Sequence, residues 1–196
     1  LCLLRGHPDR VEGAAGMQPV GHGRIASRRV SASPSLMLAI DIGGTKMAVA
    51  LVDRDGAVLA RAVRPTPANG SADELFAAVV AGMAEVGTDD VLAVGVGCGG
   101  PMERGGSAVS PLNIPGWRAF PLRDRLAEHV GRPTFVDNDA KALALGEAWK
   151  GAAIGVRDFL AMVVSTGVGG GIVLDGRLLD GRAGNAGHIG HVVVEP

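Results

Sequence analysis

The chain has 196 residues, of which 47% are hydrophobic and 20% charged, and its formal net charge is −1. This composition is typical of a globular protein, and the near-neutral charge gives no general footprint for nucleic acid or an acidic membrane. The two cysteines, Cys2 and Cys98, are far apart, so we expect no disulfide framework and a reducing, cytoplasmic location. No apolar run reaches the ~18 residues of a membrane span, so neither a membrane nor a nucleic acid is an expected partner.

Both ends indicate a fragment. The sequence starts at Leu1 rather than Met, and it stops in a strand-like run at 192–196. Residues 1–36 lack hydrophobic periodicity, are rich in Arg and Ser, and have no apolar centre of the kind a signal peptide needs. We expect 1–36 to be a disordered or spurious extension upstream of a true start at Met37, with a transit peptide as the weaker alternative.

Residues 38–63 are predicted to form a β-meander. Two tight turns, at Gly43-Gly44 and at 53–56, separate segments rich in strand-forming residues. The predicted strands are 38–41, 47–52 and 57–63. Ser71 and Glu74 then match a capping box, which predicts that a helix starts after Ser71.

Strands and helices alternate beyond that helix, which predicts a mixed α/β sheet. The continuous apolar runs at 91–96 and 159–164 are typical of buried strands. A helix is expected at about 122–130, and a hairpin is expected over 169–179 around an Asp175-Gly176 turn.

The stretch at 136–140 joins a predicted strand to a predicted helix. Asn138 can cap this helix with its side-chain oxygen, which places Asp139 in the first turn on a rigid element. Open α/β sheets place their ligand chemistry at such strand ends. Taken alone, Asp137, Asn138 and Asp139 are better explained as polar residues that cap the helix. Two glycine-rich segments elsewhere reverse this preference and favour a functional role.

Those segments are Asp41-Ile-Gly-Gly-Thr-Lys46 and Ser165-Thr-Gly-Val-Gly-Gly-Gly171. Adjacent glycines let backbone N–H groups approach phosphate oxygens, and Asp41 can hold Mg²⁺ directly or through water, although a plain turn explains the first segment equally well. Neither segment has Walker-loop spacing, and the second opens a strand rather than the helix of a dinucleotide-binding motif. A carboxylate flanked by two such hairpins favours phosphoryl transfer, in which it takes a hydroxyl proton.

Five ordered motifs over 37–196 resemble the ROK family of sugar kinases and sugar-responsive repressors. They are Asp41-Ile-Gly-Gly-Thr-Lys46, Asn113-Ile-Pro-Gly-Trp117, Asp137-Asn-Asp-Ala140, Ser165-Thr-Gly-Val-Gly-Gly-Gly171 and Gly187-His-Ile-Gly-His191. The resemblance implies an α/β, actin-like (ribonuclease H-like) ATPase fold with two lobes around a sugar cleft. We expect an N-terminal lobe over 37–137 and the start of an incomplete second lobe over 138–196.

The resemblance also implies roles for individual residues. Asp139 would be the general base on a sugar 6-hydroxyl, and Asn138 and Asn113 would contact the sugar. The residues implied in holding ATP phosphates and Mg²⁺ are Asp41, Gly43, Gly44, Thr45, Lys46, Ser165, Thr166, Gly167 and Gly169. The donor would be ATP or polyphosphate, and the full-length protein would be a homodimer.

The last motif departs from the commonest family pattern, because His188 stands where family glucokinases carry a sugar-binding glutamate. The segment Ala-Gly-His-Ile-Gly-His is similar to the corresponding motif of bacterial N-acetylmannosamine kinases. Glucose and N-acetylmannosamine therefore both stay open as substrates. A histidine can donate a hydrogen bond where a carboxylate only accepts. His191 is similar to the family histidine that faces the sugar and ligates a structural Zn²⁺, whose other ligands would lie beyond Pro196.

We therefore predict an ATP-dependent hexose or N-acetylhexosamine kinase. The alternative is a sugar-responsive repressor, which would carry an N-terminal helix-turn-helix that residues 1–36 do not resemble. A chain that lacks the downstream cysteines and the rest of the second lobe is expected to have little or no activity alone. Cys98 is expected to be a small buried residue, and Trp117 is expected to pack a loop wall.

Overall fold

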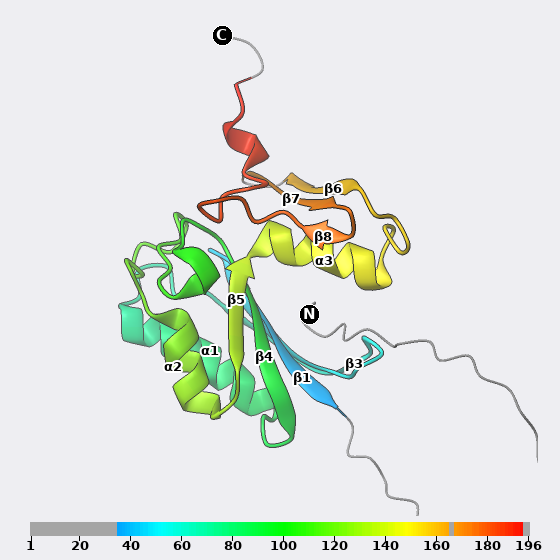
Figure 1. Cartoon of the computed structure of the whole chain (residues 1–196). Helices are drawn as coiled ribbons and strands as arrows, with labels where there is room; N and C mark the ends of the chain where they lie inside the picture. Colours follow the sequence, from blue (N-terminus) through cyan, green and yellow to red (C-terminus); the bar gives the residue numbers. More distant parts are fainter. Residues whose placement is uncertain (1–34, 165–166, 194–196) are drawn as a thin grey trace, which may run out of the picture.

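The computed structural model describes residues 35–164 and 167–193, which form two β-sheets with one helix between them (Figure 1). The larger sheet has the strand order β3-β2-β1-β4-β5 and the smaller sheet β6-β7-β8. The strands are β1 Leu36–Ile42, β2 Lys46–Val52, β3 Val58–Pro65, β4 Val91–Cys98, β5 Thr134–Asn138, β6 Phe159–Val164, β7 Val168–Leu174 and β8 Arg177–Leu178. The helices are α1 Ala72–Val86, α2 Leu122–Val130 and α3 Asp139–Lys150, with 3-10 turns η1 Arg104–Gly106 and η2 Ile189–His191.

The extension predicted over 1–36 lies outside the described residues except for its last two positions. Leu36 already belongs to β1, where it pairs with Val91 of β4. The strand-like run predicted at the end of the chain is not a strand at 192–193, which follow the 3-10 turn η2.

The larger sheet combines a meander with parallel strands, which confirms the predicted mixed α/β sheet. β1, β2 and β3 pair antiparallel, whereas β4 and β5 run parallel to β1. The second turn of the meander forms because the Asp53 carboxylate accepts the backbone N–H groups of Asp55 and Ala57, at 2.8 and 2.9 Å. The parallel strands require crossover connections, and α1 and α2 supply them.

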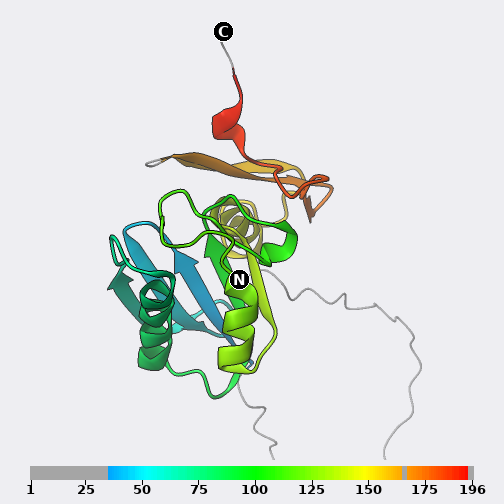
Figure 2. The same cartoon turned by 90° about the vertical axis from the view of Figure 1, so that its left-hand side faces the viewer.

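Helices α1 and α2 lie side by side on one face of the larger sheet (Figure 2). The predicted capping box is confirmed: the Glu74 N–H donates to the Ser71 hydroxyl at 3.3 Å, and the Ser71 N–H donates to the Glu74 carboxylate at 2.8 Å. Trp117 is fully buried, stacks on Phe120 with ring centroids 4.6 Å apart, and donates to the Ala72 carbonyl. The irregular segment around Trp117 is thereby fixed to the start of α1.

The smaller sheet corrects one prediction, because β6 is a strand but not a buried one. Leu160, Met162 and Val164 are 48%, 52% and 73% exposed. β6 pairs with β7 along one edge, and α3 packs against one side of this sheet (Figure 1). A continuous apolar run indicates burial on both faces, and within 35–164 and 167–193 one face of this strand is left uncovered.

The carboxyl ends of the three parallel strands meet beside the start of α3. Strand register places Asp41 of β1 next to Gly97 of β4, and Gly97 next to Asp137 of β5. This is the edge where open α/β sheets hold ligands. None of the helices in the described ranges is long and apolar enough to cross a membrane.

Candidate active site

The centre of the candidate site is the junction of β5 and α3. Asn138 caps α3 as predicted, since its Oδ1 accepts the Ala140 N–H at 3.0 Å. The Asp139 carboxylate also accepts this N–H, at 2.8 Å, and its side chain is exposed. A carboxylate in the first turn is stabilised by the positive end of the helix dipole. The fold therefore holds Asp139 in an ordered position where a substrate hydroxyl can reach it.

The start of α3 packs on β4 at Gly97. A Cβ built on Gly97 would lie 3.5 Å from the Asp139 Cα, an ordinary packing distance, so Asp139 lies next to this strand. Across the sheet, burial raises the pKa of Asp41 above its ordinary value, and the Asp139 charge raises it further, while Lys46 and Arg61 act in the opposite direction. Two carboxylates that repel each other in this way favour a cation between or beside them.

Asp41 and Asp139 fit a phosphate-bound Mg²⁺ in chemistry. Mg²⁺ is held by one or two carboxylates together with substrate phosphates rather than by an all-protein cage. The like-charge effect of Asp139 on Asp41 is the observation that supports this fit. Zn²⁺ differs, because a structural site needs four ligands, and within the described ranges no three His, Cys, Asp or Glu side chains are grouped so that they could hold a metal ion. The zinc predicted at His191 does not fit these residues alone and stays a prediction.

Cys98 lies beneath the two carboxylates and is fully buried, which confirms the predicted small buried residue. Burial, followed by the charges of Asp139 and Asp41, raises the pKa of its thiol to about 12. The thiolate is the reactive form, so Cys98 is expected to be inert.

We expect Cys98 in the native protein to resist alkylation at pH 8. A pKa raised from 9.0 to about 12 leaves about 10³-fold less thiolate at that pH, because the deprotonated fraction falls tenfold per unit. Peptide mapping by mass spectrometry after iodoacetamide treatment should find Cys98 unmodified in folded protein and modified after denaturation. Rapid native labelling would contradict the buried position.

The first glycine-rich segment is the tight turn between β1 and β2. The Gly43 N–H donates to the Lys46 carbonyl at 3.0 Å, and the Thr66 hydroxyl donates to the Gly43 carbonyl at 2.7 Å. Thr45 and Lys46 are exposed and available to a ligand. Thr66, a buried polar residue after β3, fixes this turn, and its position in the sequence gave no indication of that role.

Gly44 has a packing role in addition to the predicted phosphate role. A Cβ at Gly44 would lie 2.6 Å from the Asn113 Cβ, so the turn and the 113–116 loop touch through a glycine. Both line a cavity of about 260 Å³ that also includes Thr66 and Leu75. Asn113 therefore packs against the first turn, and its predicted contact with a sugar stays a prediction.

The second glycine-rich segment packs β7 onto α3. Ser165 and Thr166, predicted to contact phosphate, lie outside the described residues. A Cβ at Gly169 would lie 3.1 Å from the Ala140 Cβ, and one at Gly171 only 2.5 Å from the Ala144 Cβ. These glycines thus allow close contact between α3 and β7. This packing role was not part of the phosphate-binding prediction.

His188 is brought to Asn138, although 50 positions separate them in the sequence. A Cβ on Gly100 would lie 3.8 Å from the His188 Cε1 and 4.0 Å from the Asn138 Nδ2, so both side chains approach the same point. His191 follows on the 3-10 turn η2, its ring centroid 6.2 Å from that of His188, and it is exposed. Three segments therefore converge on one site: the β1–β2 turn, the start of α3, and the stretch after β8.

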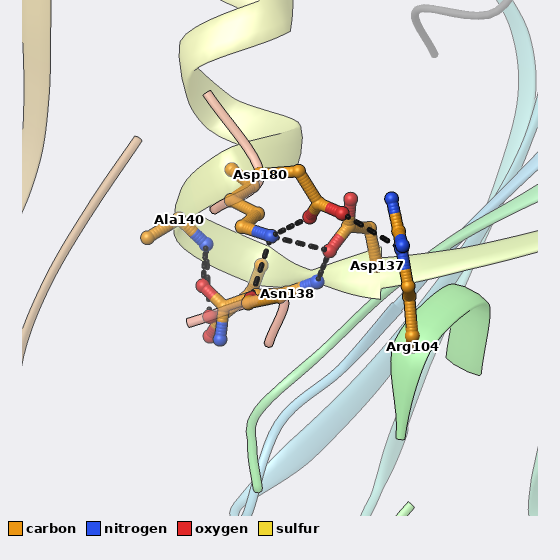
Figure 3. Close-up of polar contacts among 8 residues, drawn as sticks. Arg104, Asp137, Asn138, Ala140 and Asp180 are labelled. Carbon is orange, nitrogen blue, oxygen red and sulfur yellow. Dashed lines mark hydrogen bonds and ion pairs between the residues drawn. The ribbon is translucent and has the colours of Figure 1, made fainter. Parts of the chain in front are cut away.

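Sequence reasoning missed a buried lysine at this site. Lys141 is 1% exposed and its ammonium lies 2.5 Å from the Asp180 Oδ1, 2.8 Å from the Gly184 carbonyl and 3.5 Å from the Asp137 Oδ1 (Figure 3). The hydrogen bond from Lys141 is the main cause that lowers the pKa of Asp180. The spacing of Asp137 and Lys141, four residues apart across a helix start, was the available signal.

This fold, with carboxylates at the ends of parallel strands and a second sheet beyond α3, is that of the actin-like ATPases. The chain belongs to the ROK family, whose sequence model matches residues 37–196. Both the family and the fold class predicted from the motifs are confirmed.

Named relatives include sugar kinases. The chain is 39% identical over 163 residues to a glucokinase from Thermotoga maritima, covering 82% of this chain and 51% of the relative. It is 43% identical over 160 residues to an N-acetylmannosamine kinase from Citrobacter koseri, covering 81% and 54%. The chain thus spans about half the length of the curated relatives it matches.

Solved structures give the same fold. A ROK family glucokinase from Streptomyces griseus, in complex with glucose and AMPPNP, matches with a TM-score of 0.75 at 38% identity, over 83% of this chain and 52% of that one. A ROK family transcriptional regulator, a homolog of the E. coli MLC protein, matches with a TM-score of 0.70 at 27% identity, over 83% and 42%.

Proposed function

We propose that the full-length protein transfers a phosphoryl group from ATP to a hydroxyl of a hexose or N-acetylhexosamine. The observation that carries this proposal is the position of Asp139, exposed at a capped helix start and close enough to Asp41 to raise its pKa. The named activities of the glucokinase and N-acetylmannosamine kinase relatives support it. The protein would act in the cytoplasm as a homodimer. It would hold a structural Zn²⁺ with His191 and with further ligands from residues beyond Pro196.

In the proposed reaction, Asp139 acts as general base. Its carboxylate accepts the proton of the sugar 6-hydroxyl while that oxygen forms a bond to the terminal phosphorus of ATP. The bond from this phosphorus to the bridging oxygen breaks at the same time, and ADP leaves with the electron pair. Asn138, whose side chain faces the same point as His188, would orient the sugar.

The β1–β2 turn would hold the phosphates. Thr45 and Lys46 are exposed there, and Lys46 supplies a positive charge. Asp41 would bind Mg²⁺, which when bound neutralises charge on the phosphates. Gly167 and Gly169, with Ser165 and Thr166, would lie on the other side of the nucleotide.

A panel of sugars tests this function. The panel consists of glucose, N-acetylmannosamine, mannose and N-acetylglucosamine. We expect the full-length protein to release ADP in a coupled assay with glucose or N-acetylmannosamine. Polyphosphate in place of ATP distinguishes the donor. No sugar-dependent ADP release with any of the four would contradict the kinase.

A sugar-responsive repressor is the second candidate, since the ROK transcriptional regulator shares this fold. It would bind sugar without turnover, and its DNA contacts would come from a helix-turn-helix outside these residues. Sugar binding by calorimetry in the absence of ADP release would favour it.

A further inference from the structure

The buried ammonium of Lys141 is held by contacts within the protein. Lysine is almost never fully buried unless it is paired. The ammonium donates hydrogen bonds to one oxygen of Asp180 and to the carbonyl of Gly184, and it forms a longer ion pair with one oxygen of Asp137 at 3.5 Å. Lys141 therefore serves as a fixed internal link and is not available to a ligand.

The three partners of Lys141 come from two segments that are distant in sequence. Asp137 is the next-to-last residue of β5, and its Oδ1 also accepts the Asn138 N–H at 2.7 Å. The Lys141 ammonium is thus joined to the backbone of Asn138 through a single oxygen atom. On the other side, Asp180 and Gly184 belong to the stretch after β8 that leads to His188.

A second cation, Arg104, also contacts the Asp180 carboxylate. Arg104, in the 3-10 turn η1, lies 3.5 Å from the Asp180 Oδ2, while Lys141 holds the Oδ1 of the same carboxylate (Figure 3). Asp180 therefore lies between η1 and the start of α3. A cavity of about 220 Å³ is lined by these residues, so Asp180 can shift if its ammonium partner is lost.

We propose that Lys141 is a positioning residue that holds Asn138 and Asp139 at a fixed distance from His188. The proposal rests on the proposed function only in that a sugar occupies the point faced by Asn138 and His188. Lys141 itself lies in the first turn of α3, two residues after Asp139, and its hydrogen bonds to Asp180 and Gly184 connect that turn to the segment 180–188. Loss of the link lets the two halves of the sugar site move apart.

The test compares two single variants with the double variant in the full-length protein. Lys141→Met removes the ammonium, and Asp180→Asn removes the charge of its closest partner. Each is expected to weaken the affinity for sugar about tenfold or more and to lower kcat, because misplacement by ~1 Å costs about 10²-fold in well-oriented reactions. KM for ATP is expected to stay within about twofold, since the β1–β2 turn makes no contact in this link.

The double variant should be no worse than the worse single variant, because both changes break one contact. Asp73→Asn is the matched control: it removes an exposed ion pair with Arg125 on the helices α1 and α2, away from the site, and should leave every constant unchanged. Sugar affinity is measured by calorimetry with glucose and with N-acetylmannosamine, and kinetics are normalised to folded protein.

Variants that lose thermal stability but keep wild-type sugar affinity and kcat would overturn the positioning role. If Lys141→Met does not fold, Asp180→Asn decides alone, since its carboxylate is partly exposed and its replacement is nearly isosteric. A wild type that binds sugar without releasing ADP would contradict the kinase only, because the calorimetric comparison still tests Lys141. A wild type that binds none of the four sugars of the panel would overturn both proposals.

Discussion

Asp139→Asn in the full-length protein is expected to lower kcat about 10²–10⁴-fold, the contribution of a positioned general base. The asparagine keeps an oxygen that can accept the Ala140 N–H, so the start of α3 should keep its structure. Its side chain can still hydrogen-bond a sugar hydroxyl, but it cannot take the proton. Sugar affinity is therefore expected to change only a few-fold while turnover is lost.

The measurement is a coupled ADP assay beside sugar calorimetry. Asp124→Asn provides the same chemical change on α2, where Asp124 pairs with Arg123 at the surface, and should leave both quantities at wild-type values. Undiminished turnover by the Asp139 variant would exclude Asp139 as the general base. Equal loss of sugar binding and turnover would indicate that the substitution disturbs the structure of the site instead.

Gly187→Ala is expected to destabilise the fold and weaken sugar binding together. Gly187 has φ +95°, in the left-handed region that favours glycine, and a Cβ there would lie 2.1 Å from the Gly170 carbonyl oxygen of β7. Backbone strain and overpacking each cost about 1–3 kcal/mol, so the free energy of unfolding should fall by about 2–6 kcal/mol. His188 is the next residue, so relief of the clash is expected to change its position relative to Asn138.

Thermal unfolding and sugar calorimetry on the full-length protein check this expectation. Gly155→Ala is the matched control, because Gly155 also has a positive φ, of +80°, but has nothing within 4 Å of an added Cβ. It should cost only about 1–2 kcal/mol, from the left-handed backbone alone, and leave sugar affinity unchanged. Equal effects of the two variants would show that contact with β7 does not position the 187–191 segment.

Local patterns were sufficient to predict much of the fold. The capping box at Ser71, the turn at Asp53 and the Asn138 cap each depend on residues within five positions of one another, so spacing alone identifies them. The ordered motifs similarly predicted the family and its fold, and the family match over 37–196 agrees. The burial of β6 could not be predicted this way, since burial depends on what packs against each face.

The sequence by itself determined the chemistry available: a helix-borne Asp139, two glycine-rich turns and the histidines at 188 and 191. Only the tertiary structure decided which of these groups meet. Chain folding brings His188 to Asn138 and places Asn113 against Gly44 of the first turn. It also buries Lys141 against Asp180, because an ammonium excluded from water must find its acceptors wherever the chain supplies them, and these lie 39 to 43 residues away. Contacts at that separation leave no periodicity in a sequence, so the link between the two halves of the site appears only in the folded chain.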